Sequence, residues 1–163
     1  MSRRRMAVAV VFAATGVIAL GTPPVGLAGN GPTPLQGRML VSQIQAELKT
    51  ARFHSGEPAQ KVTTLAGVQL HLHHVLNCLE GPSGADFSAQ AGDPREGQGN
   101  GIIPDLQVAA QHDLPGANAA LEEAQACQAL ARQALSSNDL NEAQPYALVV
   151  SRHLQTADKY ISE

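Results

Sequence analysis

Residues 140–161, LNEAQPYALVVSRHLQTADKYI, decide the fold. Their apolar side chains recur at spacings of three and four, the pattern of a helix with one buried face. The repeating positions are Leu140, Ala143, Ala147, Val150, Leu154, Ala157 and Ile161. The stretch therefore predicts a long helix that packs against other helices, with Pro145 kinking its start.

A second helix is predicted just before it, over residues 117–135. Its apolar face carries Leu121, Ala124, Ala131 and Leu135. The turn between the two helices, SSND at 136–139, is short and rich in residues that cap helix ends. A short turn of this kind predicts an antiparallel helical hairpin.

The first half of the chain predicts another hairpin. One helix is expected over residues 35–54, ended by SGEP at 55–58, with Ser55 as the N-cap of the next helix. That next helix is expected over residues 57–80, ended by Gly81 and Pro82. Two hairpins without a strand pattern predict an all-α fold, an up-down-up-down four-helix bundle over residues 35–163.

The second connection of this bundle, residues 81–116, is unusually long. It is rich in Gly, Pro, Asp and Ser, and PDLQVAAQ at 104–111 is the one helical piece expected within it. Long connections in compact domains are often functional. Residues 29–34 are expected to form a flexible leader.

The first 28 residues predict a secretory signal peptide. Three arginines at 3–5 precede an apolar run at 6–20, and small residues with the sequence GLA follow at 26–28. The apolar run is short for a membrane span. We therefore expect cleavage after Ala28, a periplasmic or secreted location, and no membrane span after cleavage.

The composition excludes several classes of partner. Without the three arginines at 3–5, fourteen acidic residues face eight basic ones, and tryptophan is absent. An acidic chain with few aromatic side chains is not expected to bind nucleic acid or anionic membranes.

The strongest candidate for chemistry is HLHHVLNCLEG, residues 71–81. His71 and His74 are spaced i, i+3, and His74 and Cys78 i, i+4, so a helix brings them within reach of one ion. Imidazole and thiolate groups are ligands for copper and zinc. The motif therefore predicts a transition-metal site.

Other helices are expected to supply the remaining ligands. With equal rise per residue in an up-down-up-down bundle, Cys127 lies level with about residue 70 and His153 with about residue 74. Met39 falls in the same slice but points away from the apolar face of its helix, whereas His54 and His112 fall outside the slice. The predicted metal ligands are therefore His71, His74, His153, Cys78 and Cys127.

A disulfide is the alternative role for the two cysteines. Paired cysteines are usual in exported proteins, and a Cys78–Cys127 bridge would stabilise the fold by about 3–4 kcal/mol. The expected difference in level between them is about 12 Å. A bridge requires Cα atoms within about 7 Å of each other.

Catalysis and covalent haem have no motif in the chain. No Ser-His-Asp order, paired carboxylates or phosphate-binding glycine loop is present, so the protein is not expected to be an enzyme. The absence of a CxxCH motif excludes covalent c-type haem.

Residues 120–157, ALEEAQACQALARQALSSNDLNEAQPYALVVSRHLQTA, resemble small exported metal-binding four-helix-bundle proteins. In that family alanine-rich helices carry a histidine near a helix end. The chain is also similar, more loosely, to periplasmic b-type cytochrome bundles, in which a methionine of the first helix and a histidine of the last ligate haem. Met39 and His153 occupy comparable elements.

Three functions follow as expectations. The first is binding of copper or zinc for buffering or delivery in the periplasm. The second is a disulfide-stapled bundle without metal that binds a periplasmic protein partner. The third is non-covalent haem binding through His153 or His71.

Overall fold

The computed structural model describes residues 31–95 and 98–163 of the chain, which are all-helical in their regular structure. The sequence prediction of an all-α fold is therefore confirmed for the described residues. The predicted signal peptide and the first two residues of the leader, 29 and 30, lie outside them. The helices are α1 (Pro34–Ser55), α2 (Glu57–Lys61), α3 (Leu65–Glu80), α4 (Ile102–Gln111), α5 (Ala117–Ser136) and α6 (Leu140–Ser162).

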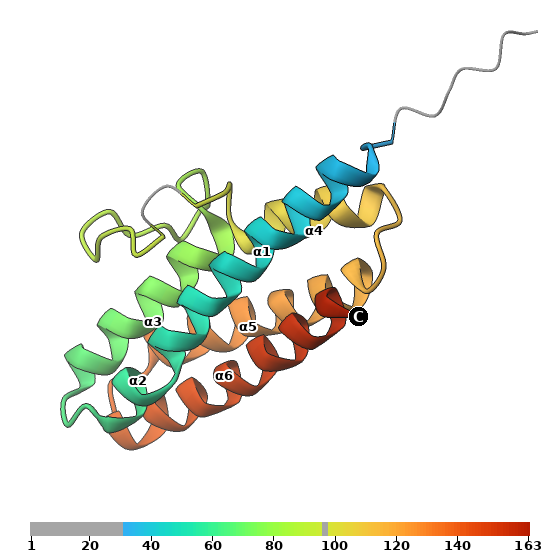
Figure 1. Ribbon diagram of the computed structural model, residues 1–163. Helices are drawn as coiled ribbons and strands as arrows, with labels where there is room; N and C mark the ends of the chain where they lie inside the picture. The colour runs from blue at the N-terminus through green and yellow to red at the C-terminus, as the bar shows by residue number, and fades with distance from the viewer. Residues whose placement is uncertain (1–30, 96–97) are drawn as a thin grey trace, which may run out of the picture. The chain divides into compact units, whose positions relative to one another are not determined.

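The four long helices pack around a core of leucine, isoleucine, valine and alanine side chains. α5 lies alongside α6, α1 contacts α3 and α6, and α3 contacts α5 (Figure 1). The predicted apolar face of the last helix is buried, with Val150 and Leu154 fully inaccessible. Asp139 caps α6 by accepting a hydrogen bond from the backbone of Asn141, and Pro145 lies within the helix, which continues to Ser162.

The predicted helix over residues 57–80 is wrong in one respect, because it is two helices. α2 ends at Lys61, and Val62 and Thr64 have extended backbone. The Thr64 hydroxyl accepts a hydrogen bond from the Gly67 amide and so starts α3 as its N-cap. A run of β-branched residues, Val-Thr-Thr, favours this break. Ser55 is not the expected N-cap but the last residue of α1.

The long second connection contains α4. α4 contains the predicted helical piece and packs against α5, α1 and α3. The rest of the connection before α4, residues 81–101, is called here the 81–101 loop. Its two ends touch, since a Cβ atom on Gly81 would lie 1.7 Å from the Asn100 carbonyl oxygen, and one on Gly101 would lie 2.6 Å from the Glu80 carbonyl carbon.

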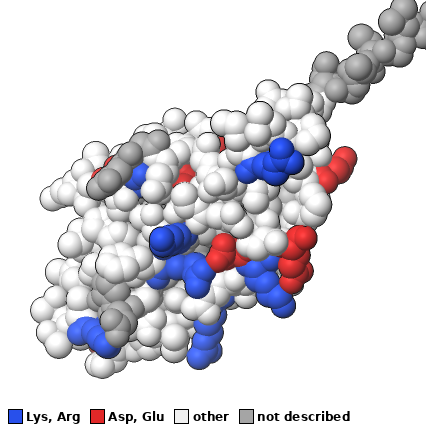
Figure 2. All heavy atoms as spheres, viewed as in Figure 1, with Lys and Arg blue, Asp and Glu red and all other residues white. Residues whose placement is uncertain are grey.

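Charged side chains of both signs lie next to one another on the face shown in Figure 2. Arg52 on α1 pairs with Asp158 on α6, and Arg132 on α5 pairs with Glu80 and Asp86. No helix in the described part of the chain is long and apolar enough to cross a membrane.

Candidate metal centre

Three histidines from two helices converge on one point. His54 lies in the last turn of α1, and His71 and His74 lie one turn apart on the face of α3 that meets α1. One ring nitrogen from each of the three lies within 4.8 Å of the other two. All three side chains are partly buried, between the helices and the surface.

The spacing of the ring nitrogens fits a transition-metal ion. His54 Nδ1 lies 3.3 Å from His71 Nδ1 and 3.1 Å from His74 Nδ1. Zinc–nitrogen bonds of about 2.0–2.1 Å with tetrahedral angles place ligand atoms about 3.3 Å apart. Two of the three pairs therefore already have this spacing, and the third pair, His71 and His74, lies within 4.8 Å.

The second ring nitrogen of His74 is also engaged. His74 Nε2 donates to the carbonyl oxygen of Ala91, in the 81–101 loop, at 2.7 Å. Metal-ligating histidines usually donate their other N–H to a carbonyl or carboxylate, which fixes the ring orientation. His74 thus has the outer hydrogen bond that is typical of a metal ligand.

The surroundings keep two of these imidazoles neutral, which is the form that binds a metal. Burial lowers the pKa of His54 to about 4, and the neighbouring His74 and His71 add to the effect. Burial, followed by His74, likewise lowers the pKa of His71. Phe53 packs edge-on against the His54 ring, with centroids 5.2 Å apart.

Neither cysteine joins the histidine group in the described part of the chain. Cys78 and Cys127 are both free and fully buried, so the predicted disulfide is not formed. Burial raises the pKa of Cys78 to about 12 and also raises that of Cys127. Because a thiol must ionise to ligate a metal, this burial opposes metal binding by either cysteine.

His153 lies elsewhere, on α6, where its Nδ1 is 2.5 Å from Glu123 Oε2 on α5. Glu80 at the end of α3 accepts from Gln128 Nε2 on α5, so Glu123 and His153 lie beyond that end of α3. The expected level of Cys127, near residue 70, is wrong, because Gln128, the residue after it, bonds to Glu80. Met39, the other haem-ligand candidate, is 64% exposed.

His54 is the residue that the sequence analysis missed. A continuous helix over 57–80 would pair the end of α1 with the start of that helix, far from His71. In the structure α2 and residues 62–64 form the connection between α1 and α3, and the last turn of α1 meets the middle of α3. The Thr63-Thr64 pair, with a glycine three residues after Thr64, was the signal for this break.

A second polar cluster anchors the 81–101 loop to α1. Arg95 is 1% exposed and its guanidinium binds Asp93 at 2.9 Å and the carboxylate of Glu47 at 3.4 Å. Glu47 Oε1 also accepts from the amide of Gly101 at 3.0 Å, while its Oε2 is buried without a hydrogen-bond partner. The cluster is structural, because its one guanidinium is already engaged by these two carboxylates.

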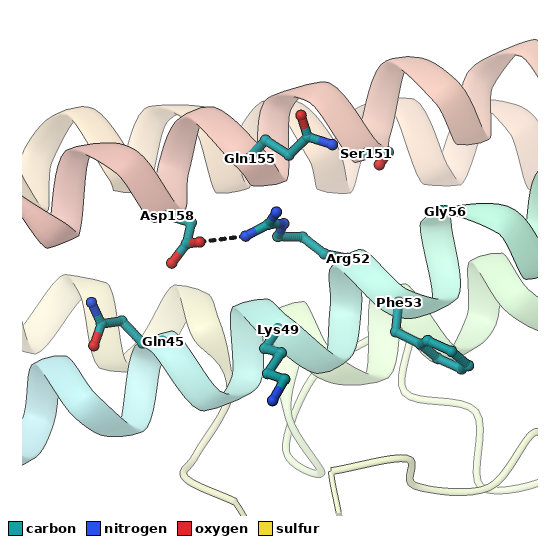
Figure 3. A pocket seen from close by; sticks show the side chains of 8 residues that line it. All are labelled: Gln45, Lys49, Arg52, Phe53, Gly56, Ser151, Gln155 and Asp158. Atoms are coloured by element: carbon teal, nitrogen blue, oxygen red, sulfur yellow. Dashed lines mark hydrogen bonds and ion pairs between the residues drawn. The ribbon is translucent and has the colours of Figure 1, made fainter.

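A surface pocket lies between α1 and α6, and its lining includes Phe53 and Gly56 at the end of α1 (Figure 3). Arg52 and Asp158 pair with each other across it, and Lys49 is the other charged residue in its lining. Since the arginine is neutralised within the pocket, this lining offers weaker ligand chemistry than the three histidines.

Comparisons with protein-family models, with curated proteins and with solved structures give no match to this chain. We therefore infer the function of this chain from the geometry of the histidine site.

Proposed function

We propose that this protein binds one transition-metal ion through His54, His71 and His74. The observation that carries the proposal is the convergence of their ring nitrogens within 4.8 Å. Three imidazoles without a thiolate suit Zn²⁺ and Cu²⁺, and copper is favoured on affinity alone. The role that fits such a site is buffering or delivery of the metal.

The test is a titration of the purified chain with Co²⁺, whose visible absorption reports its coordination, followed by competition with Zn²⁺ and Cu²⁺. We expect one ion per chain and loss of binding in each of His54→Ala, His71→Ala and His74→Ala. Two variants serve as controls. His73→Ala changes the neighbouring residue on α3, and His153→Ala changes the histidine paired with Glu123.

Unchanged binding in both controls supports the proposal. Binding that persists after loss of any two of the three site histidines would contradict it. Binding that is lost in His153→Ala would instead favour the ligand set expected from the sequence. Cys78→Ala and Cys127→Ala should leave the affinity unchanged, since neither thiol belongs to the site.

We infer that the protein acts outside the cytoplasm, in the periplasm or after secretion. The inference rests on the arginines at 3–5 and the apolar run at 6–20. Sequencing the N-terminus of the protein recovered from the producing cells should find cleavage near residue 28, and protein that stays in the cytoplasm with Met1 intact would contradict the inference.

We further infer that α1, α3, α5 and α6 form an up-down-up-down bundle, to which α2 and α4 are additions. Support comes from the contacts between α1 and α3, α3 and α5, α5 and α6, and α1 and α6. Nuclear Overhauser effects between the start of one helix and the end of its neighbour would report the relative directions of these helices. A helix pair with parallel directions among those contacts would contradict this topology.

A further inference from the structure

One fully buried side chain holds the segment of loop that contacts the metal site. Residues 88–92, called here the 88–92 turn, lie against Asn77 of α3. The Asn77 amide nitrogen donates to the carbonyl oxygens of Ser88 at 2.9 Å and Gly92 at 2.6 Å. Its oxygen accepts from the Ser88 amide at 2.8 Å. Asn77 thus holds both ends of the turn.

Ala91 lies between these two anchors, and its carbonyl oxygen accepts a hydrogen bond from His74 Nε2 at 2.7 Å. A carbonyl oxygen carries no hydrogen, so the proton of this bond belongs to Nε2. A neutral imidazole has only one N–H, and therefore His74 Nδ1 keeps its lone pair. His74 Nδ1, which carries this lone pair, lies 3.1 Å from His54 Nδ1, inside the histidine group.

We propose that Asn77 is a positioning residue of the metal site, because it holds the 88–92 turn where Ala91 fixes His74 in the tautomer that ligates through Nδ1. This inference rests on the proposed function of His54, His71 and His74. Asn77 and His74 are spaced i, i+3 on α3, so one helix face carries both the ligand and the group that fixes its outer hydrogen bond.

The opposite tautomer would weaken the site. With the turn released, the Nε2–H of His74 loses its acceptor, and a proton on Nδ1 becomes competitive because it can bond to His54. A proton on Nδ1 occupies the ligand atom and must leave before the ion binds. Outer-shell partners of this kind typically change metal affinity about 10–100-fold when they are removed.

A purely structural role for Asn77 is the competing explanation, and the chain offers a matched control for it. Glu80 lies one turn after Asn77 and also holds the 81–101 loop, through the Asp86 amide at 2.8 Å. The Glu80 carboxylate accepts hydrogen bonds from Asp86, Gln128 and Arg132, and none of these residues belongs to the 88–92 turn. Glu80→Gln therefore loosens the loop without touching Ala91.

The experiment combines ring ¹⁵N–¹H correlation spectra of histidine-labelled, metal-free protein with a Co²⁺ titration. Wild type should show His74 as the Nε2–H tautomer. Asn77→Ala should lose that preference and bind Co²⁺ about 10–100-fold more weakly. Glu80→Gln should keep both the tautomer and the affinity.

The wild-type spectrum tests the proposal even if Asn77→Ala does not fold, since a proton on His74 Nδ1 in wild type would overturn it. Histidine-dependent Co²⁺ binding with equal affinity and an unchanged tautomer in Asn77→Ala would overturn the role of Asn77 and leave the metal site standing. Absence of histidine-dependent binding in wild type would overturn the metal site and this inference together.

Discussion

Glu47 of α1 and Asp105 of α4 are two buried carboxyl groups that meet at Gly99. A Cβ atom on Gly99 would lie 2.5 Å from Glu47 Oε1 and 2.5 Å from Asp105 Oδ2. Burial, and then the charge of Asp105, raise the pKa of Glu47 from its ordinary 4.5 to about 7. Arg95 and the Gly101 amide oppose this shift but do not cancel it.

Stability should therefore fall with rising pH because of Glu47. Between pH 4.5 and about 7 the folded protein holds a proton that the unfolded chain has released, so the free energy of unfolding decreases across this window. We expect a contribution on the order of 2–4 kcal/mol that is absent from Glu47→Gln. Urea unfolding of both proteins across this pH range measures it.

The comparison with Glu47→Gln is needed because the histidines have the opposite sign. The lowered pKa of His54 makes stability increase with pH between about 4 and its ordinary 6.5. That contribution is common to both proteins and cancels in their difference. A difference that is flat with pH would show that Glu47 is ionised throughout.

Gly99→Ala should destabilise the fold strongly. The backbone at Gly99 has a φ of +46°, and a methyl group there would also meet Glu47, Asp105 and Gln43 within 2.6 Å. We expect a loss above about 3 kcal/mol, the sum of backbone strain and this clash. Gly92→Ala is the control, since its φ is +88° but nothing lies within 4 Å. It should cost only about 1–2 kcal/mol, and equal losses would rule out the clash.

Metal should stabilise the folded chain. An ion that binds only the folded state adds about 2.7 kcal/mol to the free energy of unfolding when its free concentration is 100 times Kd. We expect Zn²⁺ to raise the Tm of wild type and His153→Ala, and to leave His71→Ala/His74→Ala unchanged. Calorimetry checks this, and an equal rise in the double variant would place the ion elsewhere.

Both cysteines should be slow to react with thiol reagents in the folded protein. Each side chain is fully buried, and burial raises the pKa of each thiol. Two thiols per chain should react at once in denaturant. Rapid modification of one in the native protein would show that its helix opens locally, and failure of both in denaturant without reductant would indicate a disulfide.

The helices that carry long apolar repeats could be predicted from the sequence. The spacing through Val150 and Leu154 identified α6, and the capping residues near Asp139 located its start. These features are local, because the period of a helix is set by its own residues. The break after Lys61 is also local, but the apolar spacing continues across it from Val62 to Leu65 and conceals it.

The candidate site could be predicted only in part. His71 and His74 belong to one helix, so their proximity follows from their i, i+3 spacing. The approach of His54, and the separation of His153, depend on how far one helix slides along another. The packing of α2 and α4 sets how far the long helices slide along one another. This packing depends on contacts between distant parts of the chain. Helix periodicity contains no information about it.

The meeting of Gly81 and Gly101 has a consequence for how this protein can vary. Because the 81–101 loop leaves the helices and rejoins them at nearly one point, its length is decoupled from the spacing of α3 and α4. Apart from Arg95 and Gly99, which meet Glu47 of α1, the loop can therefore change separately from the helical core. Insertions near the 88–92 turn can retune the environment of His74 while the helices that hold the three imidazoles stay where they are.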